Sequence, residues 1–158
     1  GLAPAMVKLE ISENAVSGRG VGQVRKAMDK VAGLGFELAL DDFGTGQSAL
    51  SHLHYLPIAE IKVADAFVRS VIRNPKDEAI VMATLALCRH LGLRCIVEGI
   101  ENEAQMRHLA ALGAEIGQGF HWARPMPIAA FLDSMGQARH ALPGERPGER
   151  LDERLESR

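Results

Sequence analysis

Leu40-Asp41-Asp42-Phe43-Gly44-Thr45-Gly46 is the stretch from which the fold and the site of this chain are best read. Two adjacent carboxylates follow an apolar run, and a turn rich in glycine comes next. Neighbouring anions at the edge of a packed core repel each other and resist desolvation, so either one takes up a proton or a cation lies between them. The alternative is a solvated turn in which Asp42 caps a following helix. The rest of the chain has to decide between these interpretations.

The composition is that of an ordinary globular domain. The chain has 158 residues, of which 47% are hydrophobic and 24% charged, and its formal net charge is -2. It has no basic run and only one Trp and one Tyr, so we do not expect DNA binding. The longest apolar run, 79–88, is too short for a membrane segment. We therefore expect a cytoplasmic chain, although regions outside it can tether a full-length protein to a membrane.

Strand and helix patterns alternate about five times along the chain. The expected strands are 6–12, 36–40, 60–64, 94–99 and 115–120, and the expected helices are 21–34, 48–55, 77–91, 103–112 and 127–140. This alternation predicts βα units and an α/β fold with a parallel sheet, either open and doubly wound or forming most of a barrel. A complete eight-unit barrel needs about 250 residues, so a barrel implies that the N-terminal units lie outside this chain.

The composition changes after Leu142. Residues 143–158 contain Pro-Gly-Glu-Arg twice and carry dense mixed charge with only two leucines. Such a segment cannot bury enough apolar surface to order itself. We expect one domain over residues 1–142 and a charged, disordered tail or linker over 143–158.

Each expected strand carries a polar residue near its carboxyl end, on the face opposite its larger apolar neighbours. These residues are Glu10, Asp41, Lys62, Glu98 and, as a looser case, Gln118. The carboxyl ends of parallel strands are where βα enzymes place their chemistry. A single glutamate there is more often a surface acid, and Lys62 alone can simply pair with Glu98. The occurrence of such residues at the ends of several consecutive strands favours an active site over these separate explanations.

The acidic residues of this set suggest a metal centre. Glu10, Asp41, Asp42 and Glu98 offer hard oxygen ligands suited to Mg²⁺ or Mn²⁺, with Lys62 as a fixed cation beside them. Such a site can hold two metals about 4 Å apart and activate water for in-line attack on a phosphate ester. The residues alone therefore predict metal-assisted phosphoester hydrolysis.

The motifs of the chain, taken together, resemble the EAL domain of bacterial cyclic di-GMP phosphodiesterases. They are Leu9-Glu10-Ile11-Ser12-Glu13, Asp41-Asp42-Phe43-Gly44-Thr45-Gly46, Ile61-Lys62-Val63, Val97-Glu98-Gly99-Ile100-Glu101, Gln118-Gly119-Phe120 and Arg124-Pro125-Met126-Pro127. The resemblance implies a modified TIM-like (β/α) barrel that hydrolyses one phosphodiester bond of cyclic di-GMP to give linear pGpG. It also implies a homodimer formed through this domain and an upstream sensory or GGDEF-type domain in the full-length protein.

The same resemblance implies roles for the strand-end residues. Glu10 and Asp41 match ligands of a first metal, while Asp41 and Asp42 serve the second, so Asp42 also counts among the catalytic residues. Glu98 matches the general base or water-orienting acid. Lys62 matches the lysine that holds the nucleophilic water and steadies the charge of the phosphate.

Three further residues match positions of the family's active site. Glu13 resembles the catalytic-site glutamate that anchors the loop after the aspartate pair, here residues 43–48. Glu101 and Gln118 match positions that we assign to substrate binding.

The chain also departs from the family pattern. The tripeptide Glu-Ala-Leu is absent, and the nearest string, Glu78-Ala79-Ile80, lies inside an expected helix. The family's metal-binding asparagine precedes the strand of Glu10, where only nine residues are present. Ala64 stands where the family usually has Asp, and Gln47 replaces the usual aromatic residue.

These departures leave two interpretations. The leading one is the C-terminal part of a cyclic di-GMP phosphodiesterase domain that carries most of the catalytic residues, with the isolated 158-residue chain inactive. The alternative is a non-catalytic cyclic di-GMP receptor or regulatory module. Asp41, Asp42, Lys62 and Glu98 favour the enzyme, because a receptor needs neither a metal pair nor a base, whereas Ala64 favours the receptor.

A few residues outside the motifs have simpler expectations. We expect Cys88 and Cys95 to be buried and reduced, and the six histidines to have surface or packing roles. For Phe120 and Trp122, stacking on a guanine base and packing in the fold are both open.

Overall fold

The computed structural model describes residues 1–16, 20–46 and 53–141. The chain divides into two units, Gly1–Ala123 and Arg124–Arg158. The sheet and every candidate site residue belong to the first unit, and helix α6 (Ile128–Ala141) belongs to the second. The expected helix at 48–55 lies largely outside the described residues, and the expected tail at 143–158 lies entirely outside them. Within the described ranges, no helix has the length and apolar character that crossing a membrane requires.

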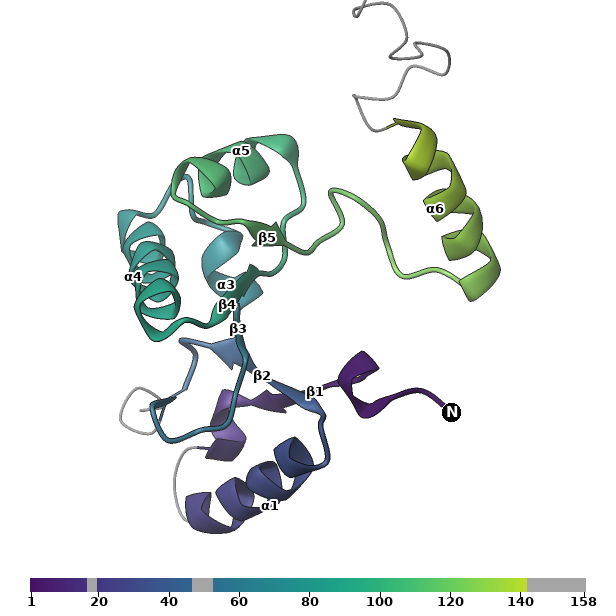
Figure 1. Ribbon diagram of the computed structural model, residues 1–158. Coiled ribbons are helices and arrows are strands. Elements are labelled where there is room, and N and C mark those ends of the chain that lie inside the picture. The colour runs from purple at the N-terminus through teal and green to yellow at the C-terminus, as the bar shows by residue number, and fades with distance from the viewer. Residues whose placement is uncertain (17–19, 47–52, 142–158) are drawn as a thin grey trace, which may run out of the picture. The chain divides into compact units, whose positions relative to one another are not determined.

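The first unit is built on a parallel sheet of five strands in the order β1-β2-β3-β4-β5 (Figure 1). The strands are β1 (Lys8–Ser12), β2 (Glu37–Phe43), β3 (Glu60–Val63), β4 (Arg94–Val97) and β5 (Ile116–Gly117). The helices between them are α1 (Val21–Gly33), α3 (Asp65–Val68), α4 (Pro75–Leu91) and α5 (Glu103–Ala111), with short 3₁₀ helices η1 (Pro4–Met6) and η2 (Glu13–Val16). The predicted alternation of strand and helix and the parallel pairing are confirmed.

The strands bury one face against the helices, as their alternating pattern predicts. Leu38 and Leu40 of β2 and Ile61 of β3 pack with helix residues such as Met28 and Cys88 in one apolar cluster. A second cluster joins residues of β3, α3, α4, β4 and α5, namely Val63, Val68, Val71, Val81, Leu85, Val97, Ile100 and Leu109. The intervening strand residues therefore point to the opposite face, where the polar positions lie.

The amino ends of the strands are joined by ion pairs around Glu60. This carboxylate is 1% exposed, and its oxygens lie 2.6 and 2.7 Å from Lys8 Nζ and 3.1 Å from Arg94 Nε. Arg94 also pairs with Glu37. Lys8, Glu37, Glu60 and Arg94 begin β1, β2, β3 and β4, so the four strands are held together at the end away from the predicted site.

Most element boundaries differ from the sequence expectation by one to three residues, and the strand expected over 115–120 is reduced to Ile116–Gly117. Two of the differences have identifiable reasons. Strand β2 continues through the aspartate pair to Phe43 rather than ending at residue 40. The reason is that the strand pairs with β3 on both sides of the aspartates, at Leu40 and at Phe43. Helix α4 begins at Pro75, two residues before the expected start. Asn74 caps it by accepting a hydrogen bond from the Lys76 amide at 3.1 Å, and proline is well suited to the first helical position.

Candidate metal and substrate site

An irregularity in β2 shapes the aspartate pair. Leu40 pairs with Ile61 and Phe43 with Val63, so β2 has one more residue than β3 over this interval. Asp42, which lies within this interval, has φ +56°, and its amide donates a hydrogen bond to Asp41 Oδ1 at 3.0 Å. In a regular strand, adjacent side chains point to opposite faces. The bulge instead allows both aspartates to serve the same site.

The two aspartates meet Glu98 at the carboxyl ends of β2 and β4. Each of Asp41, Asp42 and Glu98 offers one carboxylate oxygen, and these three atoms lie within 4.8 Å of one another. Asp41 and Glu98 are partly buried, whereas Asp42 is exposed. Clustered carboxylate oxygens are the ligands that Mg²⁺ and Mn²⁺ prefer, so this group fits a divalent cation.

Lys62 lies among the carboxylates of the site. Its Nζ is 2.8 Å from Glu10 Oε1, 2.8 Å from Glu98 Oε1 and 3.4 Å from Asp41 Oδ1, while its side chain is only 6% exposed. Burial acts against the charge of Lys62, but the hydrogen bonds that Lys62 donates to Glu10 and Glu98 and the nearby negative charges outweigh burial and raise its pKa. Lys62 is therefore a permanent cation that draws three acids together.

The structure brings Glu10 and Glu98 to this lysine from strands that are not neighbours. Glu10 belongs to β1 and is joined to the group through Lys62, while its own oxygens are not among the three closely spaced ligand atoms. Burial raises the pKa of Glu98, although the hydrogen bond from Lys62 acts in the opposite direction. Glu98 is thus a carboxylate whose affinity for a proton is increased by its surroundings.

Glu13 holds the turn that follows β2. Its carboxylate is 3% exposed, and its Oε2 accepts hydrogen bonds from the amides of Gly44 at 2.8 Å and Gly46 at 2.9 Å. A Cβ on Gly46 would lie 2.8 Å from the Glu13 carboxyl carbon, so the close approach requires glycine. Gln47 and the rest of the expected loop lie outside the described residues.

A groove of about 500 Å³ extends from this centre across the ends of β3, β4 and β5. The predicted residues Asp42, Glu98, Glu101 and Gln118 line it together. Asp65 and Arg69 line it as well, and sequence reasoning missed both. Their i, i+4 spacing of opposite charges was a visible signal, but such pairs are common on surface helices.

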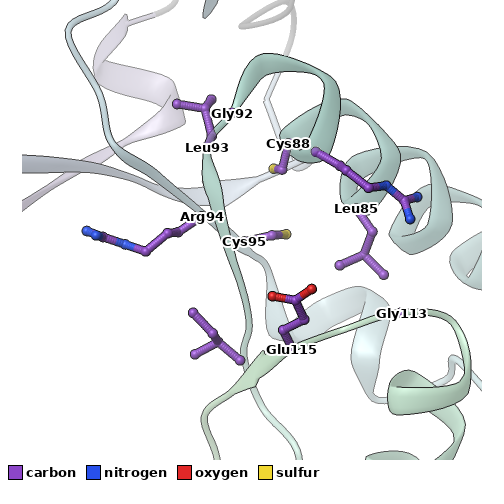
Figure 2. A pocket seen from close by; sticks show the side chains of 10 residues that line it. Leu85, Cys88, Gly92, Leu93, Arg94, Cys95, Gly113 and Glu115 are labelled. Atoms are coloured by element: carbon purple, nitrogen blue, oxygen red, sulfur yellow. The ribbon is translucent and has the colours of Figure 1, made fainter.

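The two cysteines lie elsewhere, in a pocket of about 270 Å³ between α4 and β4 (Figure 2). Both are free, and the interaction between their thiols lowers the pKa of Cys88 and, together with burial, raises that of Cys95. Cys88 is buried as expected, but Cys95 is only partly buried, because its strand borders the pocket.

The aromatic residues after β5 are about half exposed, with Phe120 at 48% and Trp122 at 54%. Phe120 lines the groove. Trp122 instead lies against Gly117, where an added Cβ would come 2.9 Å from the indole ring.

The fold and site define a class: α/β proteins with a parallel sheet that gather carboxylates and a lysine at the carboxyl ends of their strands. Comparison with known proteins gives the family. The EAL domain model matches residues 1–125, and the chain belongs to the EAL domain family. The resemblance carried by the motifs is confirmed.

Two relatives from Pseudomonas aeruginosa show how much of a protein the match covers. The bifunctional diguanylate cyclase/cyclic di-GMP phosphodiesterase MucR is 37% identical over 134 residues, which are 85% of this chain and 19% of MucR. The cyclic di-GMP phosphodiesterase RocR is 36% identical over 132 residues, which are 84% of this chain and 33% of RocR. The chain therefore spans a fifth to a third of the length of these relatives.

Two solved structures show the fold. The phosphodiesterase of MucR in complex with c-di-GMP superposes with a TM-score of 0.78 at 36% identity, covering 82% of this chain and 52% of that chain. BlrP1 of Klebsiella pneumoniae, in manganese/cy-diGMP complexes, gives a TM-score of 0.74 at 34% identity over 78% of this chain and 31% of that chain. The five-stranded sheet with its helices is thus part of a TIM-like α/β barrel, as expected.

Proposed function

We propose that this chain is the C-terminal portion of an EAL phosphodiesterase domain that hydrolyses one phosphodiester bond of cyclic di-GMP to give linear pGpG. The observation that carries the proposal is the group formed by Asp41, Asp42 and Glu98 beside the buried Lys62. The names of MucR and RocR support the substrate, and the complexes of BlrP1 support a divalent metal.

In this proposal, Glu10 and Asp41 would hold one divalent cation and Asp41 and Asp42 would hold a second, with Mg²⁺ or Mn²⁺ as the metal. Bound cations would stabilise negative charge on the phosphate and lower the pKa of water. The chain itself keeps Glu10 and Asp41 close together, because the positive charge of Lys62 offsets the repulsion between their carboxylates.

Glu98 accepts a proton from the attacking water. Its raised pKa makes it a better base than an exposed glutamate, and Lys62, 2.8 Å away, orients the carboxylate and opposes the charge that develops on the phosphate. Water adds to phosphorus, the bond from phosphorus to one ribose oxygen breaks, and that oxygen takes a proton from solvent water. Glu98 then returns its proton to the solvent. The other phosphodiester bond stays intact, so the product is linear.

The remaining predicted residues position the loop and the substrate. Glu13 fixes the turn after the aspartate pair through its contacts with Gly44 and Gly46. Glu101 and Gln118 line the groove beside Glu98 and contact the nucleotide. The homodimer, the upstream sensory or GGDEF-type domain and the cytoplasmic location remain predictions for the full-length protein.

The test is hydrolysis of cyclic di-GMP by the full-length protein with Mg²⁺, followed by chromatography of pGpG. We expect Glu98→Gln to lower the rate by at least about 100-fold while cyclic di-GMP binding survives, because the substitution removes the base and keeps the shape. Glu103→Gln is the matched control, since Glu103 is exposed and pairs with Arg107. A Glu98→Gln enzyme near the wild-type rate shows that Glu98 is not the base.

One observation favours the second candidate, a cyclic di-GMP receptor. Ala64, where the family usually has Asp, is 1% exposed at the end of β3 and supplies no ligand. A receptor predicts binding of cyclic di-GMP by the full-length protein without formation of pGpG, so the same assay separates the two functions.

A further inference from the structure

The groove beside the acidic centre has an unequal distribution of charge. Asp42, Asp65, Glu98 and Glu101 contribute four carboxylates to its lining. Arg69 is the one cationic side chain among the described residues that line it. Arg69 is also accessible to a ligand, because 66% of its side chain is exposed.

Asp65 holds Arg69 at this position. The two form a hydrogen-bonded ion pair one turn apart, across the four-residue helix α3. The hydrogen bond with Asp65 raises the pKa of Arg69, and the charge of Glu101 adds to it. Arg69 and Glu101 both line the groove. One edge of the guanidinium is occupied by Asp65, and its other N–H groups are left for a ligand.

Asp65 is itself fixed against the residue that follows Glu98. Gly99 has φ +74°, and a Cβ built on it would lie 2.5 Å from Asp65 Cβ and 3.1 Å from Asp65 Cα. The start of α3 thus packs directly on the backbone next to the proposed base. This contact sets the position of the Asp65–Arg69 pair relative to Glu98.

We propose that Arg69, positioned by Asp65, determines specificity by binding a guanine base of the substrate at O6 and N7. This inference rests on the proposed function. In the proposed function, the reacting phosphate lies beside Asp41, Asp42 and Glu98. The part of the nucleotide near Arg69 is therefore a different part of the molecule, further along the groove.

Guanine has the chemistry that this part of the groove recognises. Its O6 and N7 are two adjacent acceptors, which match the paired donors of arginine. Its N1–H and N2–H₂ groups are donors, which suit a carboxylate such as Glu101. Adenine presents an N6 amino donor where guanine has O6, so Arg69 discriminates against adenine.

The test is a double-mutant cycle on binding by the full-length protein, measured by calorimetry with Ca²⁺ in place of Mg²⁺. The two changes are Arg69→Met and replacement of cyclic di-GMP by its 7-deazaguanine analogue, which lacks N7. We expect Arg69→Met to weaken cyclic di-GMP binding about tenfold. The variant should then bind the two ligands equally, whereas the wild-type protein prefers cyclic di-GMP.

Arg73→Met is the control, because Arg73 is exposed one turn further on and does not line the groove. Asp65→Asn should weaken binding less than Arg69→Met, since the arginine stays but loses the carboxylate that holds it. Arg69→Lys should not restore the preference for N7, because an ammonium lacks the planar pair of donors.

If the affinity losses from Arg69→Met and from removal of N7 are independent and multiply, Arg69 does not contact N7 and the inference is overturned. Wild-type affinity in Arg69→Met overturns it as well. So does a full-length protein that does not bind cyclic di-GMP. Failure of the proposed function looks different. A wild-type protein that binds cyclic di-GMP but forms no pGpG refutes hydrolysis, while the cycle still reports on Arg69.

Discussion

Lys62 is the residue on which the organisation of the acidic centre depends. It is nearly buried and pairs with three carboxylates, namely Glu10 of β1, Asp41 of β2 and Glu98, which directly follows β4. Removing the cation leaves these carboxylates facing one another in a partly buried site, which is unfavourable for each of them.

We expect Lys62→Met to lower the free energy of unfolding of the metal-free protein by about 1–3 kcal/mol, the usual cost of leaving buried polar partners unpaired. Added Mg²⁺ should raise the melting temperature of Lys62→Met more than that of the wild type, because the metal replaces the lost positive charge. Thermal melts in EDTA and in Mg²⁺ measure both effects. Equal increments in the two proteins would show that Lys62 and the metal do not share ligands.

Removing the charge of Glu98 should stabilise the metal-free protein, whereas removing Lys62 should destabilise it. Because burial raises its pKa in the folded state, the unfolded chain ionises at lower pH than the folded protein, and stability falls as pH rises through this interval. Without metal, Glu98→Gln should therefore melt at a higher temperature than wild type at pH 7. The difference should disappear at a pH well below the ordinary pKa of glutamate. A destabilised Glu98→Gln protein at pH 7 would contradict this prediction.

At the scale of elements, the turn after β2 depends on one buried carboxylate. Glu13→Ala leaves the Gly44 and Gly46 amides without their acceptor and should cost about 1–3 kcal/mol of stability. Glu13→Gln keeps one acceptor oxygen and should cost less. Hydrogen exchange of these two amides, followed alongside chemical denaturation, measures the local and global effects. Unchanged exchange in Glu13→Ala would show that Glu13 does not hold the turn.

The segment after β5 docks closely on the segment after β4. The Ile100 amide donates to the Gln118 carbonyl at 3.1 Å, and the His121 amide donates to the Ile100 carbonyl at 2.9 Å. A Cβ on Gly119 would overlap the backbone of Ile100.

Gly119→Ala should therefore destabilise the protein by about 1–3 kcal/mol through overpacking. It should also disturb the groove, because Gly119 lies between its lining residues Gln118 and Phe120. Gly33→Ala, at the end of α1 with no atom within 4 Å of the added Cβ, is the matched control and should be neutral or slightly stabilising. Denaturation curves compare the two variants.

The elements also show what the sequence could predict. Alternation along the strands placed Glu10, Asp41, Lys62 and Glu98 on one face, because a period of two is a local property of the chain. The bulge was not predictable, because the extra residue in β2 is defined only by its pairing with β3. For the same reason, the left-handed backbone of Asp42 had no local signal.

Short elements were also hard to predict from the sequence. Helix α3 has four residues and follows a strand directly, so no periodic pattern marks it. Asp65 and Arg69 were missed with it, although their spacing was visible. Their role depends on Gly99, whose approach to Asp65 is a contact between distant parts of the sequence.

At the scale of the molecule, β1 and β5 lie at the two edges of the sheet in the described residues. Leu9 of β1 and Ile116 of β5 are each 39% exposed. The chain corresponds to 52% of the MucR phosphodiesterase chain, whose remaining part has no counterpart in this match. Open strand edges with exposed apolar residues favour association with other chains.

We therefore expect the isolated 158-residue chain to show little hydrolysis of cyclic di-GMP and to self-associate at micromolar concentration. Chromatography of pGpG and sedimentation velocity measure the two properties, with the full-length protein as the reference. Robust Mg²⁺-dependent turnover by the isolated, monomeric chain would refute this expectation.

The left-handed backbone at Asp42 has a consequence for how such a protein can change during evolution. Aspartate and asparagine are among the few residues apart from glycine that adopt φ near +56° readily. Asn in place of Asp42 therefore keeps the turn but removes a charged ligand, whereas most other residues disturb both. If the protein hydrolyses cyclic di-GMP as proposed, Asn at residue 42 is thus a conformationally inexpensive change toward a protein that only senses the nucleotide.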